Sequence, residues 1–196
     1  MNRTELITSR ILESIEIKRV VSEDTIILSQ LDSLAQKCLE SLKSGGKIVF
    51  AGNGGSFADA QHLSAEFTSR FLFNRKSLAS IALGTNSSSM SAIGNDYGFD
   101  QVFAREIEGI IKPEDIFIAI STSGNSENIL EAVKNTTEMG VATVAWTGVT
   151  GGKLTDICEC IKIKSTNTAR IQECHILIGH ILCEIVEMEY FNDSRK

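Results

Sequence analysis

The chain has 196 residues, of which 42% are hydrophobic, with a formal net charge of −6 and a pI near 5.2. This length is enough for one well-buried core and short for two, so we expect a single domain over residues 1–196. The acidic balance and the lack of a Lys/Arg run argue against a nucleic-acid-binding face, and no apolar run approaches the about 20 residues that cross a membrane.

Two helices are predicted before any strand, over residues 4–20 and 23–43, because apolar residues recur there at helical spacing. Ser22 is a candidate N-cap of the second helix, and Gly45-Gly46 follows its end. A minimal sheet domain does not require these N-terminal helices (residues 1–44). Their apolar stripes either cover the flank of the domain or pack against another subunit, and we favour a homo-oligomer.

From residue 45 onward, short apolar runs alternate with helical segments, which is typical of a parallel α/β sheet. Pro113 ends the helix before the third strand, and the closing helix is apolar around much of its circumference. The predicted strands are 47–51, 78–83, 115–120, 141–146 and 159–163, and the predicted helices of this core (45–196) are 57–73, 99–111, 126–139 and 168–191.

The cysteines are five in number and lack paired spacing, and the first residues have no apolar signal core. We therefore expect the reducing cytoplasm. Cys158 and Cys160 alternate with isoleucines, which indicates buried strand positions rather than half of a zinc site, because no second Cys pair follows.

Two polar loops follow predicted strands, Gly52–Ser56 after the first and Ser121–Ser126 after the third. Free N–H groups at a helix start bind phosphate, and neighbouring parallel strands share one crevice at their carboxyl ends. The first loop alone is also typical of a tight turn, and it lacks a Walker lysine and the dinucleotide-binding glycine spacing. The second loop has more hydrogen-bonding side chains than a turn requires. Together they predict a small phosphorylated ligand.

His62, Glu66 and Arg70 are spaced four residues apart, so in the predicted helix 57–73 they would share a face toward the carboxyl edge of the sheet. A solvated helix face has the same spacing. Their position directly behind a ligand loop favours a functional interpretation, since His and Glu at this spacing form a metal pair or an acid/base pair.

In the closing helix, Gln172, His175 and His180 interrupt an apolar segment, where unpaired polar groups are costly. Gln172 and His180 lie about 12 Å apart along a helix axis. They converge with His62 and Glu66 only if the helix starts irregularly or another chain contributes, which favours a site at a subunit interface. We predict that His175 is structural, partly buried with a local partner.

The segment Asn95-Asp96-Tyr97-Gly98 predicts a turn, although Asp96 has the chemistry to bind sugar hydroxyls. Together with the other motifs it resembles the sugar isomerase (SIS) superfamily and, within it, the sedoheptulose-7-phosphate (phosphoheptose) isomerase family. The resemblance spans essentially the whole chain. It is carried by Ala51–Ser56, Asp59–His62 with Glu66, Gly94–Asp96, Ser121–Ser126, and Thr168–Glu173 with His180.

This resemblance implies a flavodoxin-like SIS domain, a five-stranded parallel sheet flanked by helices, assembled as a homotetramer with active sites at subunit interfaces. It implies conversion of D-sedoheptulose 7-phosphate into D-glycero-D-manno-heptose 7-phosphate, for the heptose of surface polysaccharides such as lipopolysaccharide or capsule. The implied zinc ligands are His62, Glu66, Gln172 and His180. The residues expected to bind substrate are Asn53, Gly54, Gly55, Ser56, Glu66, Arg70, Asn95, Asp96, Ser121, Thr122, Ser123, Ser126 and Gln172.

The reaction requires removal of a proton from C1, stabilisation of a cis-enediolate and return of a proton to C2. Glu66 is the candidate base and His180 the partner acid, while zinc would polarise the carbonyl. A zinc-bound carboxylate is a poorer base than a free one. Either Glu66 leaves the metal during turnover, or the zinc is mainly structural.

Two alternatives stay open. A SIS-type protein that binds phosphosugars or another protein without turnover would need the same phosphate loops, but it has little reason to keep the four implied ligands together. An isomerase for another ketose phosphate would share the whole site, because no residue that measures the sugar's length is identified.

Overall fold

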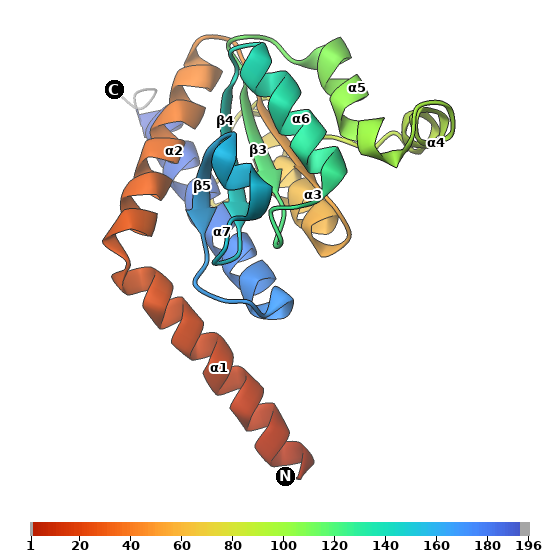
Figure 1. Cartoon of the computed structure of the whole chain (residues 1–196). Coiled ribbons are helices and arrows are strands. Elements are labelled where there is room, and N and C mark those ends of the chain that lie inside the picture. Colours follow the sequence, from red (N-terminus) through yellow and green to blue (C-terminus); the bar gives the residue numbers. More distant parts are fainter. Residues whose placement is uncertain (1, 193–196) are drawn as a thin grey trace.

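The computed structural model describes residues 2–192, so Met1 and residues 193–196 of the predicted domain lie outside it. Its five parallel strands form one sheet in the order β2-β1-β3-β4-β5 (Figure 1). This confirms the predicted flavodoxin-like sheet, with each strand within two residues of its predicted bounds. The strands are β1 (Ile48–Gly52), β2 (Ser80–Ala82), β3 (Ile116–Ile120), β4 (Ala142–Thr147) and β5 (Glu159–Lys162).

Helices cover both faces of the sheet (Figure 1). Because successive strand residues point to opposite faces, Ile48 and Phe50 of β1 belong to one apolar cluster, and Val49 and Ala51 belong to the other. The helices that pack into the first cluster are α2 (Thr25–Lys43), α3 (Gly55–Thr68) and α7 (Thr168–Asn192), and those of the second are α5 (Val102–Ile110) and α6 (Glu127–Glu138).

The order of the strands reverses at β1: β2 lies on one side of β1, and β3 lies on its other side. In the register of these strands Gly52 lies opposite Ile120, so both strands end at the same level. The helix after β1, α3, covers one face, and the helix after β3, α6, covers the other. Two loops that leave adjacent strands for opposite faces open a crevice between them, which is where open α/β sheets bind ligands.

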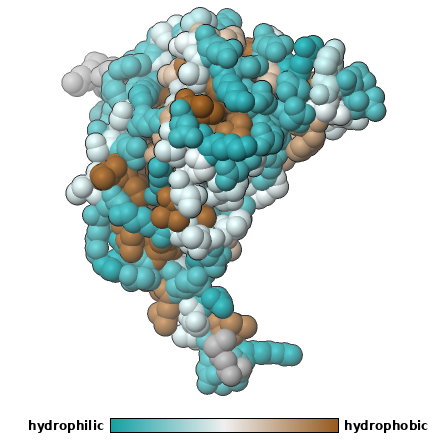
Figure 2. All heavy atoms as spheres, in the orientation of Figure 1, coloured by the Kyte–Doolittle hydropathy of each residue, from teal (hydrophilic) through white to brown (hydrophobic). Residues whose placement is uncertain are grey.

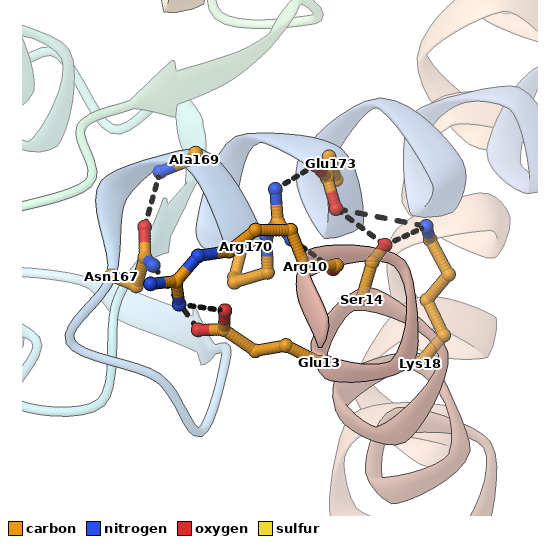
Figure 3. Close-up of polar contacts among 8 residues, drawn as sticks. All are labelled: Arg10, Glu13, Ser14, Lys18, Asn167, Ala169, Arg170 and Glu173. Atoms are coloured by element: carbon orange, nitrogen blue, oxygen red, sulfur yellow. Dashed lines mark hydrogen bonds and ion pairs between the residues drawn. The ribbon is translucent and has the colours of Figure 1, made fainter. Parts of the chain in front are cut away.

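Helix α1 (Arg3–Glu23) points away from the body of the molecule (Figure 1). Polar contacts hold it against the start of α7: the Arg170 guanidinium donates to the carbonyl of Arg10 at 2.6 Å, and the Ser14 hydroxyl donates to Glu173 at 2.5 Å (Figure 3). No helix within residues 2–192 is both long enough and apolar enough to cross a membrane.

The cap of α2 corrects a prediction. Asp24, rather than Ser22, precedes α2, and its carboxylate accepts from the N–H groups of Ile26 and Ile27 at 3.0 and 3.3 Å. Ser22 is still inside α1, where its hydroxyl donates to the carbonyl of Arg19. Serine and aspartate are both common N-cap residues, and because α1 continues to Glu23, Asp24 occupies the cap.

Two predicted helices also need correction, and one helix was not predicted. The helix predicted at 57–73 is α3 and ends at Thr68, and the helix predicted at 99–111 begins as a 3-10 turn over Phe99–Gln101. Helix α4 (Ser87–Asp96) was not predicted, because its serines and glycine are poor helix formers and none of its residues is buried. Cys160 is buried in β5, which confirms its predicted position, but Cys158 lies half-buried just before the strand, so its predicted strand position is wrong.

We expect Asp24→Ala to lower the free energy of unfolding by about 1 kcal/mol, because it removes the acceptor for two N–H groups at the start of α2. Ser22→Ala, the matched control two residues away, should change it by less than about 0.5 kcal/mol. Urea denaturation of both variants measures this. A larger loss for Ser22→Ala would contradict the assignment of the cap.

Candidate functional site

Helices α3 and α7 run parallel and in close contact. Gly55 lies beside Gln172, and Leu63 lies beside Gly179, so contacting residues keep almost the same separation in sequence along both helices. A Cβ atom on Gly179 would lie 2.6 Å from the Cδ1 atom of Leu63. Glycine at this position therefore lets the two helix axes approach closely, and the next residue of α7 is His180.

This packing brings together His62, Glu66 and His180 of a single chain. The Nε2 atom of His62 lies 3.0 Å from Oε1 of Glu66 and 3.3 Å from Nε2 of His180. All three ligand atoms lie within 4.8 Å of one another. Two imidazole nitrogens and one carboxylate are a donor set that zinc accepts, so the residues fit the predicted metal.

The group corrects two predictions about geometry. His62 and Glu66 face α7 rather than the carboxyl edge of the sheet, and His180 meets them within one chain rather than across a subunit boundary. The side chains of His62 and Glu66 remain 50% and 24% exposed. The group is therefore open to solvent on one side.

Gln172 of α7 does not join this group but lies beside the start of α3. A Cβ atom on Gly55 would be 2.5 Å from Nε2 of Gln172, so the side chain of Gln172 rests on the first loop. Along α7 it is about 12 Å from His180. This placement favours the predicted contact between Gln172 and substrate over the implied role as a fourth metal ligand in the same chain.

The two predicted ligand loops are tied together by a pair of amides. Asn53 of the first loop and Asn128 of α6 each donate to the other's side-chain oxygen, at 2.8 and 2.9 Å. In the second loop the hydroxyls of Ser121 and Ser126 lie 3.2 Å apart. Within the described residues neither α3 nor α6 has a side-chain cap, so N–H groups at both helix starts are available to an anion.

Asn128 was missed by the sequence analysis. It is 3% exposed and lies inside α6, where an asparagine is usually solvated. Its partner is 75 residues away in the chain, so no local pattern identified it. The one sequence signal for it is an asparagine in the first turn of the helix that follows a ligand loop.

A hydroxyl-rich cavity of about 260 Å³ lies beside the second loop. Predicted substrate residues Thr122 and Ser123 form part of its wall, and side chains that follow β4 and β5 form the rest. The members that the sequence analysis did not assign to substrate are Asn125, Gly148, Val149, Thr150, Ser165, Thr166, Thr168 and Ile171. Such a wall offers many neutral donors to a phosphorylated sugar.

Three predicted substrate residues belong neither to the group His62, Glu66 and His180 nor to the wall of this cavity. Arg70 follows the end of α3 and is exposed, so it does not continue the face of His62 and Glu66. Asn95 and Asp96 form the last turn of α4 rather than the predicted turn, with a hydrogen bond of 2.7 Å between their side chains. Substrate binding by these three residues stays a prediction.

His175 is buried on the face of α7 toward the sheet, and its Nε2 atom lies 3.2 Å from the carbonyl oxygen of Thr147. Burial lowers the pKa of His175 to about 4, partly offset by this hydrogen bond. A neutral, fully buried imidazole agrees with the predicted structural role, although it is more deeply buried than expected.

Comparison with known proteins identifies relatives over nearly the whole chain. A family model described as SIS domain matches residues 10–148. The phosphoheptose isomerase of Aneurinibacillus thermoaerophilus is 47% identical over 97% of this chain and 96% of its own length. Phosphoheptose isomerase 2 of Campylobacter jejuni is 44% identical over 97% of this chain and 95% of its own.

Solved structures of phosphoheptose isomerases are also similar to this chain. The phosphoheptose isomerase of Neisseria gonorrhoeae superposes with a TM-score of 0.87 at 39% identity, covering 94% of this chain and 99% of that one. The enzyme of the same name from Francisella tularensis has a TM-score of 0.90 at 34% identity, covering 96% of this chain and 100% of that one.

We expect the ring of His175 to stay neutral down to about pH 4, whereas an unfolded histidine titrates near 6.5. Because its folded pKa lies below its unfolded pKa, protonation favours unfolding, and stability should fall as the pH drops from about 6.5 to about 4. NMR titration of the ring, with urea denaturation across this range, measures both. A titration midpoint near 6.5 would contradict this.

Proposed function

The chain belongs to the phosphoheptose isomerases of the SIS-domain proteins and is an isomerase, and we propose that it converts D-sedoheptulose 7-phosphate into D-glycero-D-manno-heptose 7-phosphate. The product would supply heptose for a surface polysaccharide, lipopolysaccharide or capsule. We also propose a cytoplasmic location, since the five cysteines are free thiols in the described structure.

One observation carries the proposed chemistry: the carboxylate of Glu66 and the imidazoles of His62 and His180 meet in one chain, open to solvent on one side. A protein that only bound phosphosugars would need the loops but not this group. It therefore supports turnover over the non-catalytic alternative.

Glu66 is the proposed base. It would take a proton from C1 of the open-chain ketose and return it to C2, while His180 would protonate the oxygen on C2 and accept the proton from the oxygen on C1. The sum of these transfers moves the carbonyl from C2 to C1 with no net gain or loss of protons. The hydrogen bond of 3.0 Å between His62 and Glu66 supports an oriented carboxylate.

His62, Glu66 and His180 would hold a zinc ion. When bound, zinc would polarise the sugar carbonyl and stabilise negative charge on its oxygen. The exposure of the group leaves room for Glu66 to act either beside the ion or away from it.

The phosphate is proposed to bind between the two loops. The hydroxyls of Ser121, Thr122, Ser123 and Ser126, with the N–H groups at the start of α6, would receive it, while Asn53, Gly54, Gly55 and Ser56 would contact the sugar from the start of α3. Gln172, resting on Gly55, would join them. Asn95, Asp96 and Arg70 are kept as proposed substrate contacts.

We propose a homo-oligomer, a tetramer by family resemblance. Ile7, Ile11 and Ile15 of α1 are spaced four residues apart on the protruding helix and are 59%, 56% and 57% exposed. Figure 2 shows hydrophobic atoms at the surface of this helix. A second copy packed there would bury this stripe, and a site at the interface would cover the open side of the ligand group.

We expect the purified protein with zinc to convert sedoheptulose 7-phosphate into the aldose, observed by NMR. Glu66→Gln should lower kcat at least about 10²-fold with the fold retained, because the amide cannot accept the proton. Comparing ketose phosphates of five, six and seven carbons tests the specificity for heptose.

Glu138→Gln, at the exposed end of α6, is the matched control and should retain the wild-type rate. No conversion by the wild type with zinc present would contradict the enzyme proposal. A wild-type rate in Glu66→Gln would remove its role as base.

We expect Ile7→Glu with Ile11→Glu to dissociate the oligomer, because charges replace the apolar stripe of α1. Thr8→Glu with Ser9→Glu adds the same charge on the same exposed helix and should leave the assembly intact. Light scattering after gel filtration measures the mass of each. A monomeric wild type would refute the proposal.

A further inference from the structure

The segment between α3 and β2 is held down by one buried carboxylate of α7. Glu187 is 0% exposed and accepts hydrogen bonds from the N–H groups of Phe71 and Leu72 at 2.8 and 2.6 Å and from Nε of Arg75 at 2.8 Å. Burial raises the pKa of Glu187, but these three donors together lower it below its ordinary value. The carboxylate is therefore ionised at neutral pH.

The partner of this carboxylate, Arg75, closes the end of α3. Its side chain is 2% exposed, and its guanidinium donates to the carbonyl oxygens of Glu66 at 2.8 Å and Phe67 at 2.6 Å. These carbonyls belong to the last turn of the helix, where they have no partner within the helix; the carbonyl of Phe67 also accepts from the N–H of Leu78 at 3.0 Å. The guanidinium thus contacts the backbone of a residue in the predicted metal group.

The same segment also reaches the other helix of that group. The ring of Phe71 stacks on the imidazole of His180, with centroids 5.7 Å apart and planes at 27°. Its backbone N–H is one of the two bonded to Glu187. One short segment is therefore anchored by Glu187 and contacts both α3 at Glu66 and α7 at His180.

The ring of Phe71 also packs against the apolar core, whereas Arg75 and Glu187 form a buried ion pair. A buried ion pair is seldom more stabilising than apolar residues of the same size, because both charges lose their hydration. The contacts of this pair end on Glu66 directly and on His180 through Phe71.

We propose that Arg75 and Glu187 are positioning residues that hold Glu66 and His180 in the geometry that binds the metal. This rests on the proposed function only in treating His62, Glu66 and His180 as a zinc site. Arg75 fixes the backbone of Glu66 through its carbonyl, and Glu187 fixes the segment whose Phe71 sets the plane of the His180 ring.

The first test separates Phe71 from its neighbour Phe73, which packs on Phe191 of α7. We expect Phe71→Leu to weaken zinc binding about 10-fold, measured by competition with a chelator in the absence of substrate. Phe73→Leu removes an aromatic ring from the same segment and should stay within about 2-fold of wild type. Equal zinc affinities in the two variants would overturn the role of Phe71.

The second test uses Arg75→Lys, which keeps the charge beside Glu187 but loses the planar fork that reaches the carbonyls of Glu66 and Phe67. We expect weaker zinc binding and a lower kcat with KM unchanged, because the substrate loops are untouched. Thermal unfolding of the metal-free protein shows how much stability each variant loses. A variant that loses stability but keeps wild-type zinc affinity and kcat would show that the pair is merely structural.

The two readouts separate this inference from the proposed function. Zinc affinity tests the positioning even if the wild type does not isomerise sedoheptulose 7-phosphate, and the split between kcat and KM tests it even if the wild type binds zinc weakly. A wild-type protein that neither binds zinc nor turns over substrate leaves no site to position and refutes both.

Discussion

The close, parallel packing of α3 on α7 is the contact on which the candidate site depends. Gly179 lets Leu63 approach the axis of α7, and the residue after it, His180, then reaches His62. A Cβ atom at position 179 would lie 2.6 Å from Cδ1 of Leu63, so any larger residue there would require Leu63 or the helices to shift. A packing interaction in the apolar core thus determines whether three polar side chains can act together.

Helix α3 connects the two parts of the candidate site, the crevice with its ligand loops and the group His62, Glu66 and His180. Its first turn begins at the crevice between β1 and β3, and Ser56 there is about 9 Å along the axis from His62. An extended sugar phosphate anchored by its phosphate at the crevice would lie along α3 toward Glu66. The order of the strands, which makes β1 and β3 neighbours, therefore places the proposed phosphate site, and α3 extends from it to the proposed base Glu66.

Two buried polar pairs stabilise this arrangement from opposite ends. Asn53 and Asn128 connect the two predicted ligand loops, and Arg75 and Glu187 connect the end of α3 to α7. In each pair the hydrogen bonds between the partners offset part of the cost of removing their polar groups from water. Both pairs lie next to predicted functional residues, and neither contributes an atom that is proposed to contact the reacting carbons.

The sequence by itself determined the five parallel strands, the two ligand loops and the His62-Glu66 pair, because these depend on period and on neighbours a few residues apart. It could not place His180 beside His62, since a spacing of 118 residues carries no local signal and the answer depended on the direction in which α7 crosses α3. It also predicted that this helix continues to residue 73, whereas α3 ends at Thr68, because helical periodicity does not reveal that Arg75 and Glu187 take up the backbone groups at and just after its end. Tertiary structure decided these points because hydrogen bonds and packing between distant segments outweigh local preference wherever burial makes an unpaired polar group costly.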